Sequence, residues 1–197
     1  MARSSKQWLR RHVTDAYVRK AKEQGYRSRA AFKLLELDER ESFLKPGATV
    51  IDLGAAPGGW SQVAAQKVGP KGTVIAIDLL QIAPISGVTV VRGDFREKLP
   101  ERIKADVVLS DLSPNLSGIA NVDQARSLEF SLAAIELCRK ALKPDGVFVA
   151  KVFQGEAFDE FRERLQAAFA KVKVIKPAAS RGESRETYAV ARGLLAL

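Results

Sequence analysis

The sequence of 197 residues contains one cysteine and one histidine, and these scarcities exclude several kinds of site. A single thiol, Cys138, excludes an internal disulfide and a zinc site built from several cysteines. Cys138 falls in an apolar helical run, so we expect a buried thiol in a reducing compartment. The lone His12 lies in a basic segment and is expected at the surface or against a phosphate, not as a catalyst. No metal site is predicted.

Long apolar runs are also missing. No stretch approaches the roughly 20 apolar residues of a membrane-spanning helix. The first residues, Met-Ala-Arg-Ser-Ser-Lys-Gln, do not read as a secretory signal. Hydrophobic residues make up 46% and charged residues 28% of the chain, which is typical of a globular protein. We therefore expect a cytoplasmic protein without a membrane partner, and a monomer as the default.

Acidic residues are scarce at the N-terminus, although the whole chain has a formal net charge of +9. Residues 1–29 contain nine Lys or Arg and two acids, and therefore account for +7 of that charge. Such clustering indicates a polyanionic partner. A membrane surface is the competing partner, but the segment lacks a continuous apolar face. Nucleic acid is therefore favoured, and residues 1–28 are predicted to form a basic arm or helix ahead of one domain, 29–197.

Beyond this arm, apolar strand patterns alternate with helical ones, which predicts a doubly wound α/β fold. Helices are predicted at Arg29–Phe43, Gly58–Val68, Val122–Leu142 and Phe158–Ala170. Strands are predicted at Thr49–Leu53, Thr73–Ile77, Val88–Val91, Ala105–Leu109, Val147–Ala150, Lys173–Ile175 and Glu186–Ala191. The last two strands are close enough in sequence to form an antiparallel pair at the edge of the sheet.

The most informative segment is the turn after the first strand, Asp52-Leu53-Gly54-Ala55-Ala56-Pro57-Gly58-Gly59-Trp60. Glycines at the carboxyl end of a parallel strand let a ligand approach the backbone. The spacing Gly54-x-x-x-Gly58-Gly59 matches neither the dinucleotide fingerprint nor the phosphate-binding P-loop. A nucleoside that carries an amino acid fits better, which predicts S-adenosylmethionine. The alternative is a structural turn without a ligand.

Charged residues recur at the carboxyl ends of successive predicted strands, where such sheets bind ligands. They are Asp52, Asp78, Asp94, Asp111 and Lys151. Asp78 is expected to accept hydrogen bonds from the two ribose hydroxyls of a nucleoside. Asp94, which precedes an aromatic residue, suits an adenine amino group. Taken singly, either aspartate is equally well explained as a helix cap or turn residue.

Five segments together make the chain resemble the FtsJ/RrmJ-type ribosomal RNA 2′-O-methyltransferases over about residues 15–192. The segments are Tyr26–Leu34, Asp52–Trp60, Asp111–Asn115, Lys151–Phe153 and the pattern Ser180-Arg181-x-x-Ser184-Arg185-Glu186-x-Tyr188. The resemblance implies a Rossmann-like fold with a mostly parallel seven-stranded sheet and an antiparallel last strand. It implies a catalytic tetrad of Lys33, Asp111, Lys151 and Glu186. It also implies cofactor contacts by Gly54, Gly58, Trp60, Asp78, Asp94 and Asp111.

The tetrad suits the chemistry, because a ribose 2′-hydroxyl must lose a proton as it attacks a methyl group. A positioned base contributes roughly 10²–10⁴-fold to such a reaction. An amine is a base only when it is neutral, and a second nearby lysine disfavours its charge. We expect Lys151 to be the base and Lys33 and Glu186 to orient it and the ribose. The alternatives are a surface lysine with a buried stem at Lys33 and an ordinary edge-strand charge at Glu186.

The expected substrate is RNA, since only RNA has a 2′-hydroxyl at an internal nucleotide. The resemblance implies a uridine in the peptidyl-transferase A-loop region of 23S ribosomal RNA, in free RNA or in the assembled large subunit. Relatives that share the tetrad act on tRNA or mRNA caps, and these substrates stay open. Two other functions compete. A nicotinamide-dependent oxidoreductase would have the missing glycine fingerprint, and a silent RNA-binding protein would have a broken tetrad.

Overall fold

The computed structural model describes residues 15–100, 102–112, 120–153, 156–180, 184 and 186–196. The elements are α2 (Ala16–Glu23), α3 (Ala30–Glu41), β1 (Thr49–Leu53), α4 (Gly59–Val68), β2 (Thr73–Asp78), β3 (Val88–Arg92), α5 (Phe95–Lys98), β4 (Ala105–Ser110), α6 (Ala120–Ala141), β5 (Leu142–Phe153), α7 (Glu156–Ala168), β6 (Phe169–Ile175) and β7 (Glu186–Leu194). Residues 1–14 of the predicted arm lie outside the described residues.

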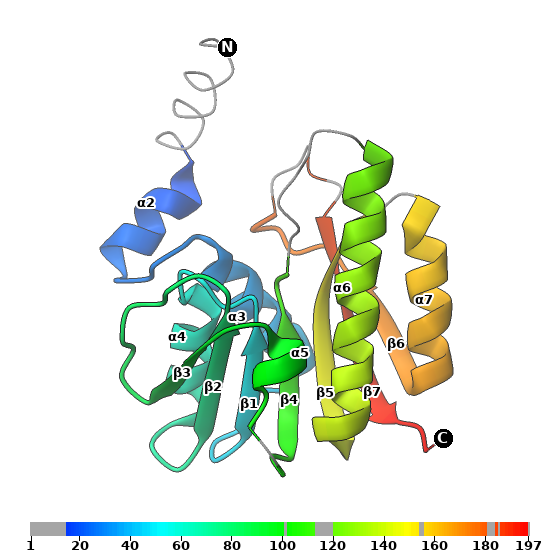
Figure 1. The fold of residues 1–197 in the computed structure, drawn as a ribbon. Coiled ribbons are helices and arrows are strands. Elements are labelled where there is room, and N and C mark those ends of the chain that lie inside the picture. The colour runs from blue at the N-terminus through cyan, green and yellow to red at the C-terminus, as the bar shows by residue number, and fades with distance from the viewer. Residues whose placement is uncertain are drawn as a thin grey trace.

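The described strands form one sheet in the order β3-β2-β1-β4-β5-β7-β6, with helices on both faces (Figure 1). The strands β1 to β5 pair in parallel, whereas β7 pairs antiparallel with both β5 and β6. The predicted doubly wound fold with an antiparallel last strand is therefore confirmed. The sequence did not predict that β7 lies inside the sheet, with β6 as the edge.

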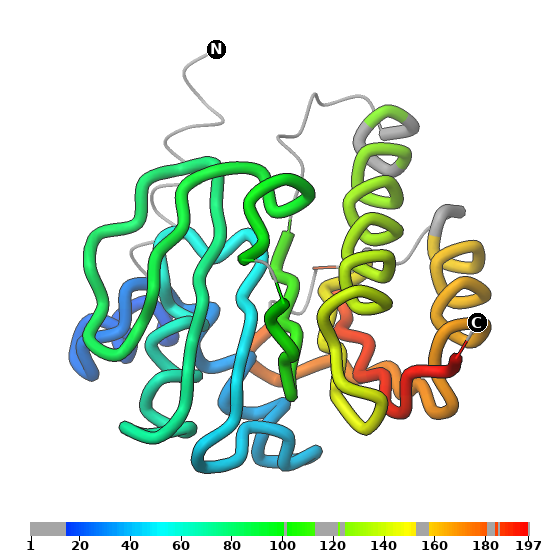
Figure 2. The backbone as a smooth tube through the Cα atoms, turned by 60° about the horizontal axis from the view of Figure 1, so that its bottom comes forward, coloured from blue at the N-terminus to red at the C-terminus, as the bar shows by residue number. Residues whose placement is uncertain are grey.

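The core consists of two apolar layers, one on each face of the sheet. Figure 2 shows the backbone of the sheet with α6 and α7 running along one side of it. Alternation along β1 divides its residues: Val50 packs toward α3 and α4, while Ile51 and Leu53 pack in the layer that holds α6 residues. The two helical layers thus fix the strand ends from both sides. No helix in the described part of the chain is long and apolar enough to cross a membrane.

The predicted element bounds hold to within three residues, apart from β5 and the start of β6, which begins four residues before the predicted strand. The strand predicted at Val147–Ala150 extends over Leu142–Phe153. Residues 143–146, which lie between the predicted helix and the predicted strand, fall within the span of β5, whose pairing with β4 shifts register between Ala105 and Val107. The short helix α5 was not predicted, because its four residues give no periodic pattern.

The described part of the basic segment packs on the domain. In α2, Ala21 contacts a small aromatic cluster with Tyr17, Tyr26 and Phe32. Arg29 pairs with Asp15 and also donates a hydrogen bond to the carbonyl of residue Ala179. The chain from residue 15 onward is therefore held against α3 and against the segment that leads to β7.

Candidate functional site

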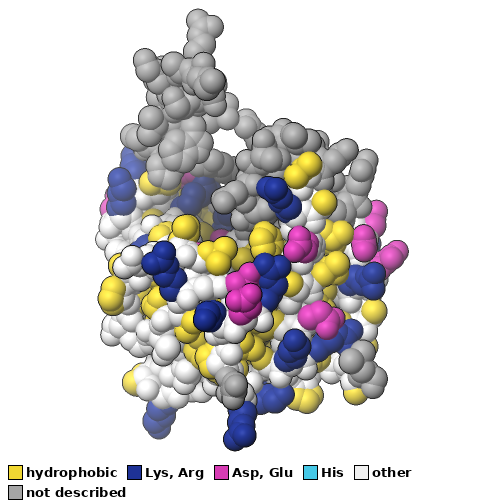
Figure 3. All heavy atoms as spheres, viewed as in Figure 1, with side chains coloured by type: hydrophobic (Ala, Val, Ile, Leu, Met, Phe, Trp, Pro, Cys, Tyr) yellow, Lys and Arg dark blue, Asp and Glu magenta, His cyan; other side chains and the backbone are white. Residues whose placement is uncertain are grey.

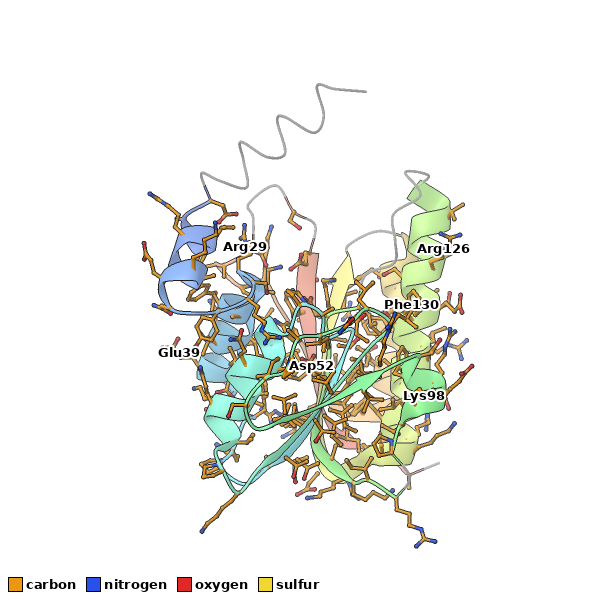
Figure 4. The ribbon with its side chains drawn as sticks, turned by 60° about the vertical axis from the view of Figure 1, so that its left-hand side comes forward. Arg29, Glu39, Asp52, Lys98, Arg126 and Phe130 are labelled. Atoms are coloured by element: carbon orange, nitrogen blue, oxygen red, sulfur yellow. The ribbon has the colours of Figure 1, made fainter. Side chains whose placement is uncertain are left out.

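A cavity of about 410 Å³ opens at the carboxyl ends of β1, β2 and β4, where the strand order reverses. In open α/β sheets this switch point is the usual place for a ligand. Its walls combine backbone, carboxylates and apolar side chains. They are Gly54, Ala56, Ile77, Asp78, Leu79, Leu80, Gly93, Asp94, Phe95, Asp111, Leu112 and Phe130. Phe130 reaches the cavity from α6 (Figure 4).

The turn after β1 forms one wall and depends on glycine. Gly54 has a φ of +68°, and a Cβ built there would lie 2.7 Å from the side chain of Leu112. A side chain at position 54 would therefore be strained and would crowd the wall. The turn is tied to the neighbouring strand by Asp78, whose carboxylate accepts hydrogen bonds from the amides of Ala56, at 2.9 Å, and Leu80, at 2.7 Å.

Asp94 lines the cavity and also caps α5. The cap interpretation is therefore confirmed, and the predicted contact with an adenine amino group stays a prediction. Its carboxylate accepts a hydrogen bond from the amide of Arg96 at 2.9 Å and further bonds from the Arg96 side chain. These hydrogen bonds lower the pKa of Asp94. Arg96 also pairs with Glu129 of α6. Acidic and basic side chains accordingly lie next to each other over α5 and α6 (Figure 3).

The four predicted tetrad residues come together beside this cavity from α3, β5, β7 and the residue that follows β4. Lys33 of α3 forms an ion pair with Glu186 at the start of β7. Lys151 of β5 lies 3.2 Å from a carboxylate oxygen of Asp111 and donates to the Asp111 carbonyl oxygen at 2.8 Å. The side chain of Lys151 is only 8% exposed, so its ammonium or amine lies largely out of bulk water.

Tyr188 joins these two ion pairs and is the residue that sequence analysis did not assign. Its hydroxyl donates to Glu186 at 2.6 Å and lies 3.2 Å from Asp111. Burial and the two carboxylates raise the pKa of Tyr188, so its hydroxyl stays protonated and able to donate. The signal was present in the sequence, since positions 186 and 188 share one face of a strand.

The electrostatic balance differs between the buried carboxylates. Burial alone would raise the pKa of Glu186, but Lys33 and the hydroxyl of Tyr188 outweigh burial and lower it. Asp52 is different, because it is fully buried beneath α4 with one hydrogen bond, from Ser61 at 2.6 Å (Figure 4). Burial raises its pKa to about 7, and the charges of Asp111 and Asp78 add to that effect. Asp52 therefore does not line the cavity, although it was grouped with the strand-end residues.

Comparison of the sequence with known families agrees with this site. Residues 26–194 match the model of the FtsJ-like methyltransferase family. The chain belongs to the FtsJ-like methyltransferase family. This methyltransferase is 51% identical over 199 residues to the Ribosomal RNA large subunit methyltransferase E of Nitrosospira multiformis, with 97% of each chain covered. It is also 51% identical over 200 residues to the protein of that name from Chromohalobacter salexigens, covering 98% of this chain and 95% of that one.

Solved structures resemble the methyltransferase in fold. A protein described as a ribosomal RNA methyltransferase from Plasmodium falciparum superposes with a TM-score of 0.78 at 28% identity, covering 87% of this chain and all of that chain. Fibrillarin from Aeropyrum pernix, solved with bound S-adenosyl-L-methionine, superposes with a TM-score of 0.59 at 15% identity, covering 84% and 75%. At that identity the second likeness concerns the fold alone.

Two further residues predicted to contact a cofactor lie outside the set that lines the cavity in the methyltransferase. Gly58, with a φ of +110°, precedes α4 and lies against Arg27 and Ile85. Trp60 is buried in the core, where its indole N–H donates to the carbonyl of Ala30 at 2.8 Å. Both residues support the turn on the side away from the cavity lining. Their predicted contacts with a ligand stay predictions.

Some predicted segments fall outside the described residues, namely residues 113–115 after Asp111 and the arginines Arg181 and Arg185. Within the described residues, no group of three or more His, Cys, Asp or Glu is arranged to hold a metal ion. Cys138 is buried in the core of the methyltransferase, where burial raises the pKa of its thiol well above the usual value.

Proposed function

We propose that this methyltransferase transfers a methyl group from S-adenosylmethionine to a ribose 2′-hydroxyl in large-subunit ribosomal RNA. The observation that carries the proposal is the cluster of Lys33, Asp111, Lys151 and Glu186 beside a strand-end cavity. The printed name of the relatives at 51% identity supports ribosomal RNA as the substrate. The resemblance in the motifs supports a uridine of the peptidyl-transferase A-loop, in a cytoplasmic large subunit.

The cavity fits S-adenosylmethionine in size and chemistry. Its volume of about 410 Å³ lies in the range of roughly 300–1,000 Å³ that small-molecule sites occupy. Gly54 leaves space that a Cβ would fill, and three carboxylates suit a ligand with hydroxyls and positive charge. We assign the ribose to Asp78 and the adenine amino group to Asp94. The carboxylate of Asp94 also accepts a hydrogen bond from the Arg96 side chain. When bound, the cofactor supplies a methyl group activated on a sulfonium.

Lys151 is the base in this proposal, because Asp111 fixes its nitrogen at two points. A neutral amine at this position can donate hydrogens to the carbonyl and carboxylate oxygens of Asp111 and direct its lone pair toward the 2′-hydroxyl. Nζ of Lys151 would take the proton of the 2′-hydroxyl as its oxygen accepts the methyl group that the bound cofactor supplies.

Lys33, Glu186 and Tyr188 orient the reacting groups. Lys33 and Glu186 form a second ion pair, and the hydroxyl of Tyr188 connects that pair to Asp111. The network holds side chains from distant parts of the sequence in one arrangement, and such alignment supplies up to about 7–11 kcal/mol in well-oriented reactions. The basic segment, whose described cations include Arg19 and Lys20, is proposed to hold RNA phosphates.

The test is transfer of labelled methyl from S-adenosylmethionine to large subunits from a strain that lacks the modification, followed by mapping of the labelled nucleotide. We expect label at a 2′-oxygen with the wild type and with Lys171→Ala, a control at an exposed lysine of β6. We expect transfer by Lys151→Ala to be slower by roughly 10²–10⁴-fold, which is the contribution of a positioned base. Cofactor binding by this variant should persist.

Failure of the proposal has distinct forms. Label in tRNA or capped RNA and none in large subunits would assign a different substrate to the same reaction. Cofactor binding without transfer to any of the three RNAs would indicate an RNA-binding protein that is catalytically silent. Full activity of Lys151→Ala would refute the role of Lys151 as the base.

A further inference from the structure

The side chain of Arg27 bridges the loop after β1 and the loop between β2 and β3. Its guanidinium donates to the carbonyl oxygens of Pro57 at 3.2 Å, Ala83 at 2.6 Å and Pro84 at 2.7 Å. Pro57 belongs to the turn after β1, and the other two belong to the loop between β2 and β3. One cation thus holds three backbone dipoles from two segments.

Both of these loops wall the proposed cofactor cavity. Ala56, which immediately precedes Pro57, lines the cavity from the first loop, and Leu79 and Leu80 line it at the start of the second. The loops also touch through an apolar cluster in which Ile82 packs with Ala55 and Ala56. Arg27 contacts the loops at their carbonyl oxygens, outside the set of residues that line the cavity.

Gly58 lies where Arg27 and the loop between β2 and β3 approach the loop after β1 too tightly for a side chain to fit. A Cβ at Gly58 would lie 2.5 Å from Ile85 Cδ1 and 3.2 Å from Arg27 Nη1. Contacts below 3.0 Å force something to move, and the positive φ of +110° adds strain for any other residue. The first loop therefore has no side chain at the point where Arg27 and the second loop meet it.

The backbone that carries Arg27 is itself anchored on α4. The backbone N–H of Arg27 donates to Oε1 of Gln62 at 2.9 Å. The side-chain nitrogen Nε2 of Gln62 donates to the carbonyl oxygen of Gly25 at 3.0 Å. One turn further along α4, Gln66 accepts a hydrogen bond from the Tyr26 hydroxyl at 3.0 Å. These hydrogen bonds hold the backbone of residues 25–27 on α4. A residue that positions other segments needs such an anchored backbone.

We propose that Arg27 is a positioning residue that holds the two walls of the cofactor cavity in their binding arrangement. Arginine suits this role because its rigid fork of donors serves several carbonyls at once, whereas lysine is a single point charge. Loss of the fork removes three hydrogen bonds to the two loops, and leaves those to Asp78, the backbone bonds of Gly54 and Ala55 to Ile77, and the apolar cluster. The inference rests on the proposed function in one respect, namely that the ligand of this cavity is S-adenosylmethionine.

The test compares S-adenosylmethionine and S-adenosylhomocysteine binding by titration calorimetry, without RNA, for the full-length wild type, Arg27→Met and Arg27→Lys. Methionine keeps the unbranched stem and removes every donor. Arg162→Met, at an exposed arginine of α7, is the matched control for loss of one arginine. We expect the dissociation constant to rise about tenfold or more for Arg27→Met if the walls adopt the binding arrangement one-tenth of the time. Arg27→Lys should fall between, and the control should match the wild type.

Hydrogen exchange of the ligand-free proteins provides a readout that does not depend on the ligand. Amides of residues 54–58 and 79–87 should exchange faster in Arg27→Met, while those of α7 keep their protection. In methyl transfer, the KM for the cofactor should rise with kcat at saturation nearly unchanged, whereas general damage to the fold would lower kcat. A variant that unfolds would show loss of protection throughout the chain, and Arg27→Lys then carries the comparison.

The outcomes separate this inference from the proposed function. Equal cofactor affinity and equal exchange in the wild type and Arg27→Met would overturn the role of Arg27 and leave the proposed function intact. A wild type that binds neither ligand would refute the proposed cofactor. In that case the exchange of the two loops still decides whether Arg27 holds them.

Discussion

Replacement of Asp52 by asparagine should make the protein less sensitive to alkaline pH. Asp52 is fully buried, and one of its carboxylate oxygens has no hydrogen-bond partner among the described residues. Burial raises its pKa from 3.8 to about 7. Between these two values the folded state keeps the proton on Asp52 and the unfolded state has lost it. Since the folded state binds the extra proton, rising pH favours unfolding, and this loss of stability levels off above pH 7.

The magnitude follows from the size of the shift. Three pH units correspond to about 4 kcal/mol in total. About half of this, on the order of 2 kcal/mol, falls between about pH 5.5 and about pH 8. Asparagine cannot ionise, but its carbonyl oxygen can still accept the hydrogen bond from Ser61. The Asp52→Asn variant should therefore lack this part of the pH dependence.

The assay is urea unfolding of the wild type and Asp52→Asn at the two pH values, with the free energy of unfolding taken from each midpoint and slope. We expect the variant to gain on the wild type by about 2 kcal/mol on going to the higher pH. Ser61→Ala removes a hydrogen bond that lowers the pKa of Asp52, so its loss of stability should extend to higher pH. Parallel pH dependence of the wild type and Asp52→Asn would refute the reasoning.

Three other predictions concern the site. Tyr188→Phe, which removes the bridge between Glu186 and Asp111, should lower kcat about tenfold and leave the cofactor dissociation constant within twofold, as steady-state kinetics and calorimetry would show. Asp78→Ala should weaken cofactor binding at least tenfold, because it frees the turn as well as removing an acceptor, and unchanged affinity in calorimetry would contradict this assignment. Deletion of residues 1–14, which carry four cations, should weaken RNA binding and flatten its dependence on salt concentration, and an unaltered slope would show that these residues do not contact RNA.

Local patterns were sufficient to predict most of the fold. The strands β1 to β4 begin at the predicted residues and end within one residue of the prediction, because apolar runs bounded by turn residues identify buried parallel strands. The position of β7 inside the sheet was not predictable, since pairing partners depend on contacts between residues far apart in the chain. Periodicity fixes which face of a strand is buried, but not which strand lies beside it.

The candidate site divides in the same way. Through resemblance to a family, the motifs predicted that Lys33, Asp111, Lys151 and Glu186 form one tetrad. Which lysine pairs with which carboxylate was not predicted. The bridge through Tyr188 and the contacts of Arg27 depend on side-chain positions across elements, which spacing in the sequence does not encode. Asp52 illustrates the limit most clearly, because a carboxylate near a strand end can face either the cavity or a helix, and one residue of register decides which.

The insertion of β7 between β5 and β6 has a consequence for the synthesis of the protein. Lys33, Asp111 and Lys151 are made before β7, and Glu186 and Tyr188 are made as part of it. A prematurely terminated chain lacks both residues and leaves β5 and β6 without the strand that joins them. The two ion pairs and the hydroxyl that joins them are therefore complete only after β7 has been made and has paired with β5.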